Sequence, residues 1–171
     1  NPAAAGTTVD PYWVAMPTTG APSARRWHSA VWAPQIDSMI IWGGGGAGIY
    51  STGGMLSYSN IAKAWGWVAT ENTVPPCPTA RKQHSAIWTG QEMIVFGGLD
   101  ANGAALDDGG RLNVNLTTSF WTALSKDNGY PTPRYIHTAV WDQPTGSVGK
   151  KMTVWGGSGA YSSGGIYEPP P

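Results

Sequence analysis

The chain has 171 residues, enough for one domain with a buried core. Charged residues make up 12% of it and the formal net charge is zero, so a nucleic-acid backbone is not an expected partner. No apolar run approaches the roughly 18 residues of a membrane-spanning helix. The single cysteine, Cys77, has no second thiol for an internal disulfide or a metal pair. Ten tryptophans and 24 glycines instead indicate an all-β fold of short strands.

The first predicted element is an outer strand over residues 11–16, with no complete unit before it. Trp13 lies 54 residues before Trp67, and Trp67 lies 54 residues before Trp121. We therefore place Trp13 in the same series as the later outer-strand tryptophans, and we expect the chain to start within a blade.

A unit of four strands is predicted next, over residues 25–70. An arginine and a histidine precede a first apolar strand, and a short turn leads to a second strand that ends at a glycine pair. A second glycine pair begins the third strand, and a tryptophan begins the fourth. In order, these elements are Arg25, His28–Trp32, Met39–Trp42, Gly43-Gly44, Gly53-Gly54 and Trp67–Thr70.

The same unit recurs twice. One copy covers residues 81–124, and another covers residues 134–167 without its fourth strand. The histidines of the three copies are spaced by 56 and 53 residues. A period near 50 residues with four strands is typical of one propeller blade. The first two strands of each unit are apolar on both faces, as expected for a blade packed between two others.

The repeated residues resemble those of kelch repeats, in the form common in bacterial secreted and cell-surface proteins. The shared pattern is Arg-x-x-His-Ser/Thr-Ala-Val/Ile-Trp, then a strand ending in Gly-Gly, then a second Gly-Gly and a tryptophan. The resemblance extends from Trp13 to Tyr167. It implies an all-β, kelch-type β-propeller with four-stranded antiparallel blades. About three blades are present, either as a partial propeller or as half of a six-bladed ring.

Two ways of completing such a propeller stay open. Either the chain is part of a longer polypeptide, or two copies join head to tail and each donates residues 12–16 to the third blade of the other. Propellers contain about 4–8 blades. Three flat blades are not expected to close a ring by themselves.

Residues that occur in every copy are expected to hold the scaffold. They include most of the tryptophans, the arginines Arg25, Arg81 and Arg134, and the three histidines. We expect the arginines to bridge carbonyls or carboxylates between blades, and each histidine to hydrogen-bond a turn beside its strand. Radial repetition separates the histidines, so no metal site and no cofactor is predicted from them.

Residues that occur once are free to carry function. The candidate binding residues lie between the arginine and the histidine of each blade, or in the loop after the first glycine pair. They are Arg26, Trp27, Lys82, Gln83, Tyr135, Tyr50 and Tyr161. A weaker candidate is a calcium loop with Asp100, Asn102, Asp107 and Asp108, although Asn102-Gly103 also favours a plain turn.

These observations favour a non-catalytic binding or structural module that contacts a protein, a surface polymer or another copy of itself. An assembly joined by strand donation is the first alternative. A carbohydrate-acting kelch enzyme is the second, by analogy of fold alone. Copper oxidases with kelch repeats use a cysteine-linked tyrosine, whereas Cys77 lies in a proline-rich loop, so that activity is not carried over. Low charge and polar turns favour an extracellular or cell-surface location.

Overall fold

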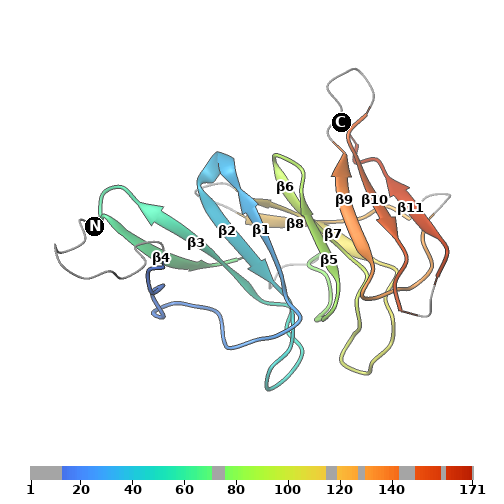
Figure 1. Ribbon diagram of the computed structural model, residues 1–171, viewed down its shortest axis with the longest axis horizontal. Helices are drawn as coiled ribbons and strands as arrows, with labels where there is room; N and C mark the ends of the chain where they lie inside the picture. Colours follow the sequence, from blue (N-terminus) through green and yellow to red (C-terminus); the bar gives the residue numbers. More distant parts are fainter. Residues whose placement is uncertain are drawn as a thin grey trace.

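The computed structural model describes residues 13–70, 76–114, 119–126, 130–142, 149–158 and 161–170. It consists of three antiparallel sheets that stand side by side, as Figure 1 shows. Blade 1 contains β1 (Ser29–Ala33), β2 (Ser38–Trp42), β3 (Gly53–Ser59) and β4 (Ala64–Ala69). Blade 2 contains β5 (Ser85–Trp88), β6 (Glu92–Phe96), β7 (Gly109–Val114) and β8 (Ser119–Ala123). Blade 3 contains β9 (Thr138–Asp142), β10 (Lys151–Trp155) and β11 (Gly164–Tyr167).

The strands of each blade are paired in chain order, so every connection is a hairpin. The first strands of the blades lie next to one another, with β1 in contact with β5 and β5 in contact with β9. A one-turn 3-10 helix, Pro34–Ile36, lies between β1 and β2. Among the described residues, no helix has the length and hydropathy needed to cross a bilayer. The architecture confirms the expected all-β partial propeller of about three blades.

The second glycine pair fixes the spacing within each blade. The first residue of the pair lies opposite the last residue of the second strand, as in Gly53 opposite Trp42. A Cβ built at Gly53 would collide with the backbone carbonyl of Ile41, and Gly109 and Gly164 meet an equivalent carbonyl. Only glycine therefore lets the second and third strands approach this closely.

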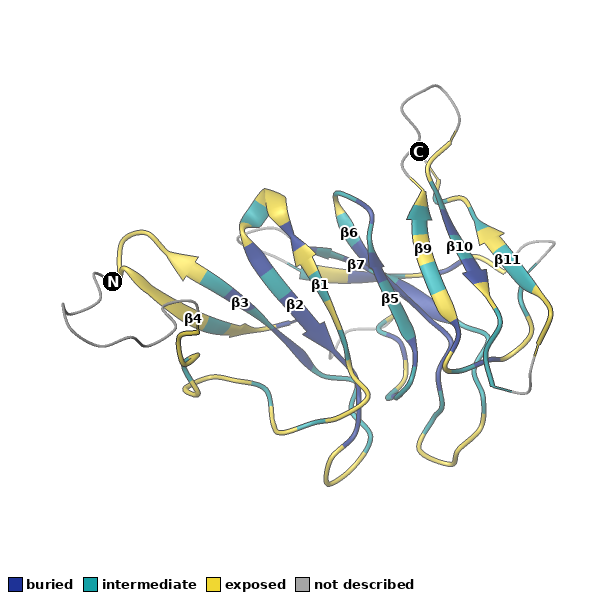
Figure 2. Cartoon of the chain, viewed as in Figure 1, coloured by how far each residue is buried: buried dark blue, intermediate teal, exposed yellow. Residues whose placement is uncertain are grey.

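Blade 2 contributes to both hydrophobic cores, one shared with blade 1 and one shared with blade 3. On β6, Met93 and Val95 face blade 1, whereas Ile94 and Phe96 face blade 3. The alternation follows from the period of two residues along a strand. Figure 2 shows the burial in β2 of blade 1, in β6 and β7 of blade 2 and in β10 of blade 3. The expected burial of both faces is therefore complete in the middle blade.

The end blades have one open face each. Trp42 of blade 1 is fully buried against blade 2, whereas Trp155 occupies the same position in blade 3 and is 58% exposed. Trp32, on the other open face, is 48% exposed. The expectation that the repeated tryptophans are core residues is therefore wrong for these two, because no blade lies beside them in this structure.

The expected outer strand over residues 11–16 is paired with no other strand of this structure in its described part, residues 13–16. Residues 11 and 12 lie outside the described part of the chain, and residues 13–16 have no strand assignment. Trp13 is 89% exposed and Val14 is 77% exposed. The physical reason is that an extended segment becomes a strand only when a neighbouring strand accepts its backbone hydrogen bonds.

A candidate interaction surface where the linkers meet

The linkers that enter each blade lie side by side on one face. Gln83 N donates to Trp27 O at 3.0 Å, and Ile136 N donates to Gln83 O at 3.0 Å. These three residues hold equivalent positions just before the histidines. Each has a positive φ, of 60° for Trp27, 57° for Gln83 and 55° for Ile136. Bulky residues rarely adopt this conformation, so the backbone ladder between blades must hold it in place.

The residues that precede this ladder are fixed to the loop of the same blade. Arg26 exchanges two backbone hydrogen bonds of 2.8 Å with Gly45. Lys82 does the same with Leu99, at 3.0 and 2.8 Å. Tyr135 O accepts a hydrogen bond of 2.8 Å from Ser158 N. The backbone therefore holds five of the predicted binding residues, Arg26, Trp27, Lys82, Gln83 and Tyr135, on one face.

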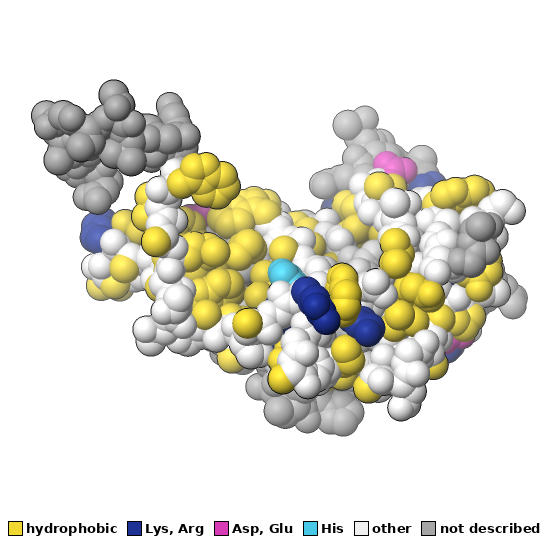
Figure 3. Space-filling model, turned by 60° about the horizontal axis from the view of Figure 1, so that its bottom comes forward, with side chains coloured by type: hydrophobic (Ala, Val, Ile, Leu, Met, Phe, Trp, Pro, Cys, Tyr) yellow, Lys and Arg dark blue, Asp and Glu magenta, His cyan; other side chains and the backbone are white. Residues whose placement is uncertain are grey.

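Three of these side chains gather into a cluster, which we call the Trp27 cluster: Arg26, Trp27 and Lys82. The Arg26 Cζ lies 4.2 Å from the centroid of the Trp27 ring, and Lys82 Nζ lies 5.0 Å from it. Trp27 remains 44% exposed. Figure 3 shows Lys and Arg side chains on either side of an apolar side chain on this face. Within the described residues, neither Arg26 nor Lys82 has an ion-pair partner.

The repeated arginines lie under this face and serve the scaffold. The Arg81 guanidinium donates to Gly97 O and Asp108 O at 3.1 and 2.9 Å and pairs with the Asp108 carboxylate at 2.8 Å. Those partners belong to blade 2, the arginine's own blade. The backbone of Arg81 bonds to blade 1 instead, through Tyr50 O and Gly44 N. The expectation that the side chains bridge blades is therefore wrong, since the backbone makes that link.

Tyr50 and Tyr161 belong to this scaffold more than to the Trp27 cluster. The Arg25 guanidinium lies 4.8 Å from the Tyr50 ring centroid, and the Arg134 guanidinium lies 5.3 Å from that of Tyr161. Tyr50 Oη also accepts a hydrogen bond of 3.1 Å from Ala47 N. The structure therefore separates these two tyrosines from the five predicted residues on the linkers.

The histidines join neighbouring blades. His84 Nε2 and Ser29 Oγ share a hydrogen bond of 2.8 Å, and His137 Nε2 and Ser85 Oγ share one of 2.7 Å. The partner is therefore a strand serine of the preceding blade, not the expected turn. Burial, and next the Arg81 charge, lowers the pKa of His84 to about 3. Burial, and next the Arg134 charge, lowers the pKa of His137 to about 4. Both rings are therefore neutral at pH 7.

The first glycine of each first pair leaves space for the imidazole of the following blade, because it has no side chain. Gly43 and Gly97 have φ values of 70° and 65°, which favour glycine. A Cβ at Gly43 would lie 2.6 Å from His84 Cε1, and a Cβ at Gly97 would lie 2.8 Å from His137 Cε1. At Gly156 in blade 3, the nearest atom is a backbone oxygen at 3.9 Å. The first glycine of each pair is thus part of the contact with the following blade.

The calcium candidate is not assembled. Asp100 Oδ1 accepts backbone hydrogen bonds from Asn102 at 2.9 Å and Ala104 at 2.8 Å, as in a turn. Asp107 pairs with Lys126 at 2.6 Å, and Asp108 pairs with Arg81. In the described part of the chain, no three His, Cys, Asp or Glu side chains form a group that could hold a metal ion. The acidic side chains stabilise the loop and the blade separately.

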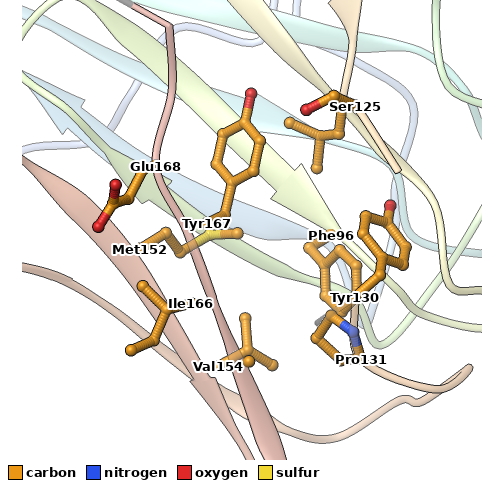
Figure 4. A pocket seen from close by; sticks show the side chains of 11 residues that line it. Phe96, Ser125, Tyr130, Pro131, Met152, Val154, Ile166, Tyr167 and Glu168 are labelled. Carbon is orange, nitrogen blue, oxygen red and sulfur yellow. The ribbon is translucent and has the colours of Figure 1, made fainter. Parts of the chain in front are cut away.

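A cavity between blades 2 and 3 is a feature that the sequence did not indicate directly. Its volume is about 400 Å³. Phe96 and Tyr130 line one side, Met152 and Val154 line another, and Gly165 of β11 also lines the cavity. Figure 4 shows the rings of Tyr130 and Tyr167 standing at this cavity. The sequence signal that could have revealed it is a third strand, Gly164–Tyr167, without a following tryptophan strand.

Comparison with known proteins agrees with this architecture. A family model described as the KLHDC2/KLHL20/DRC7 Kelch-repeats domain matches residues 6–163. No curated protein matches the chain. A solved structure of a fungal alcohol oxidase of the AA5 family, in complex with copper, superposes with a TM-score of 0.62 at 16% identity. The match covers 88% of this chain and 32% of the oxidase. At this identity the likeness shows the fold alone, and a carbohydrate-acting activity stays a prediction.

Proposed function

This chain belongs to the kelch-repeat family, and from that premise we propose that it is a non-catalytic binding module whose Trp27 cluster contacts a partner protein. The observation that carries the proposal is Trp27 itself. Its ring is 44% exposed, its backbone has a strained positive φ, and two cationic side chains flank it. A scaffold function does not need an exposed tryptophan at this position, because the Gln83 carbonyl accepts the equivalent backbone hydrogen bond from Ile136 N without one.

The chemistry of the cluster favours an acidic segment of the partner. Arg26 and Lys82 each present a positive charge without an ion-pair partner among the described residues. A carboxylate that approaches the Trp27 ring meets a guanidinium and an ammonium together, and an apolar side chain of the partner can cover the ring. Tryptophan and arginine are also the residue types that most often dominate the energy of protein interfaces.

The test uses immobilised peptides in acidic, neutral and basic sets. The acidic set is expected to bind best and to lose affinity as salt is raised. Trp27→Ala is expected to weaken that binding by about 30-fold, which corresponds to about 2 kcal/mol for an anchoring tryptophan. In Arg26→Gln and in Lys82→Gln, the affinity for acidic peptides should fall less steeply with salt concentration than it does in the native chain.

The matched control is Trp65→Ala. Trp65 is 42% exposed, close to the value for Trp27, but it lies on β4 beside Tyr58 and away from the linkers. Its substitution should leave peptide binding unchanged. Equal binding of all three peptide sets, or equal losses in Trp27→Ala and Trp65→Ala, would contradict the proposal. Thermal unfolding of each variant shows whether a loss of binding reflects a loss of fold.

A further inference from the structure

The Trp27 cluster is built from two blades. Arg26 and Trp27 lie on the linker that enters blade 1, whereas Lys82 lies on the linker that enters blade 2. Lys82 Nζ stands 5.0 Å from the centroid of the Trp27 ring because the two linkers lie side by side. The geometry of the cluster therefore depends on how blades 1 and 2, which both have four strands, are held together.

A hydrogen bond between these two blades lies close to the cluster on both linkers. Ser29 follows Trp27 by two residues on the first linker. His84 follows Lys82 by two residues on the second linker, and His84 Nε2 shares a hydrogen bond of 2.8 Å with Ser29 Oγ. Two residues span about 7 Å at most. A displacement of blade 2 at this bond therefore moves Lys82 relative to the Trp27 ring.

Arg26 does not depend on that bond. It is the neighbour of Trp27 in the chain, and its backbone is bonded to Gly45 of blade 1. The backbone of Lys82 is bonded to Leu99 of blade 2 instead. A change at the contact between the blades therefore separates Lys82 from the indole, whereas Arg26 moves together with it.

The backbone ladder between the two linkers is strained. Trp27 and Gln83, which share its hydrogen bond of 3.0 Å, both have a positive φ. Side chains disfavour this conformation, so neighbouring contacts have to hold it. His84 comes directly after Gln83, is 9% exposed, and has its ring centroid 5.3 Å from that of Trp42 in blade 1. The imidazole thus packs into blade 1 next to the strained residues and adds a second hydrogen bond there.

We propose that the bond between His84 and Ser29 positions the Lys82 ammonium within the Trp27 cluster and so sets the affinity of the cluster for its acidic partner. Both are positioning residues, because they act through Lys82. With the bond made, the partner's carboxylate meets two cations at the indole; with the bond broken, only Arg26 stays there. Partner binding favours the bonded state in return, since such coupling is reciprocal. The partner in this inference rests on the proposed function, whereas the position of Lys82 is measurable without any partner.

The first test observes the Lys82 side chain by NMR in chains labelled at lysine Cε. A methylene next to an ammonium that stands over an indole is shifted upfield, so Lys82 should give a displaced signal. The signal is assigned by its disappearance in Lys82→Gln and by its return to the ordinary lysine position in Trp27→Ala. In Ser29→Ala it should move toward the ordinary position. Lys126, which stands 5.4 Å from the centroid of the Tyr130 ring, should keep its signal in every variant.

Ser85→Ala is the matched control. Ser85 shares the same kind of bond with His137, at 2.7 Å between blades 2 and 3, and is half-buried like Ser29. The two alanine variants should therefore lose similar stability, which thermal unfolding measures. Ser85→Ala should leave the Lys82 signal in place. An equal movement of that signal in both variants, or an unchanged signal in Ser29→Ala, overturns the proposal.

A second perturbation keeps the serine and displaces the imidazole. A Cβ at Gly43, where φ is 70°, would lie 2.6 Å from His84 Cε1. A Cβ at Gly97, where φ is 65°, would lie 2.8 Å from His137 Cε1. Gly43→Ala should therefore move the Lys82 signal, and Gly97→Ala should not. A Lys82 signal that stays in place in Gly43→Ala speaks against the positioning by the imidazole.

The consequence for binding is measured with the acidic peptide set. Ser29→Ala should weaken the binding about fivefold, which corresponds to about 1 kcal/mol for one hydrogen bond. Ser85→Ala should bind as the native chain does. In the Ser29→Ala background, Lys82→Gln should add little further loss, whereas Arg26→Gln should keep its full effect. Full additivity of Lys82→Gln with Ser29→Ala would contradict the link between the bond and the affinity.

Failure of the positioning and failure of the proposed function give different results. If the native chain binds none of the peptide sets, the proposed function is wrong, and the Lys82 signal alone decides the positioning. If acidic peptides bind and need Trp27, but Ser29→Ala and Ser85→Ala bind them equally, the proposed function stands and the positioning is wrong.

Discussion

Acidification should lower the free energy of unfolding, because each contact between neighbouring blades, which we call a joint, contains a buried neutral histidine. His84 bonds to Ser29 and His137 bonds to Ser85, and both rings are about nine-tenths buried by exposed fraction, at 9% each. Their pKa values are lowered to about 3 and about 4. In the unfolded chain both rings titrate near pH 6.5. The native protein therefore resists protons that the unfolded chain accepts.

The sign and the size of the effect follow from this difference. Above pH 6.5 both histidines are neutral in either state and do not change the free energy of unfolding. Below pH 6.5 the unfolded chain gains protons, so the free energy of unfolding falls until the native pKa values are reached near pH 4 and pH 3. From pH 7 to pH 5 the loss is about 2 kcal/mol for each histidine, or about 4 kcal/mol for the two.

The assay is urea unfolding at several pH values between 7 and 5, with native and variant chains. His137→Gln should lower stability at pH 7 and should also remove about half of the loss between pH 7 and pH 5. His28→Gln is the comparison, because His28 is exposed and has no preceding blade in this structure. Burial, and next Arg25, lowers the pKa of His28, but without the enclosure of the other two rings. An equal pH dependence in the native chain and in His137→Gln would refute the reasoning.

Two further pairs of variants compare a joint with an open face. Gly97→Ala should cost clearly more stability than Gly156→Ala. Both substitutions replace a glycine of positive φ, at about 1–3 kcal/mol each, but only Gly97 also faces a histidine of the next blade. Equal shifts in the thermal unfolding of the two variants would contradict the packing between blades 2 and 3. Trp42→Ala should cost about 3–5 kcal/mol and Trp155→Ala about 1 kcal/mol, since Trp42 is fully buried and Trp155 is 58% exposed. Urea unfolding measures both, and similar losses would show that the open face of blade 3 is covered in solution.

The strands were predictable from the sequence because their signals are local. Apolar runs, glycine pairs and a spacing near 55 residues recur in the chain itself, and they place β5, β6 and β7 within a residue or two. The close approach of strands at Gly109 is also local, since a hairpin brings its second and third strands together. The segment at residues 13–16 has no strand assignment, because a strand signal without a partner strand has nothing to pair with.

The joints were not predictable in the same way because they depend on which copy lies beside which. The sequence places a serine after each of the first two histidines, but it does not show that His84 reaches back to Ser29. Nor does it show that Arg81 bonds its own blade through the side chain and the preceding blade through the backbone. The positive φ of Trp27 has no local cause either, since it follows from the ladder of linkers.

The members of the Trp27 cluster were among the residues marked by the sequence, but the sequence did not separate them from residues that lie elsewhere. Occurrence in a single copy marked Trp27 and Lys82, whose side chains lie together on the linker side. It also marked Tyr50 and Tyr161, which lie against scaffold arginines. A residue that varies between copies can still pack on a constant one, and only coordinates reveal that contact.

The bonds of His84 to Ser29 and of His137 to Ser85 give the contact between two neighbouring blades a polarity. One side of a blade carries the imidazole, and the other carries the serine and the glycine that receive the next imidazole. Two faces that both carry the imidazole, or that both carry the serine and the glycine, have no complementary groups. Neighbouring blades therefore fit together in one order only. Any further blade, from the same polypeptide or from another molecule, therefore has to pack in a single orientation. Packing of two identical open faces against each other is disfavoured because it pairs no imidazole with a serine.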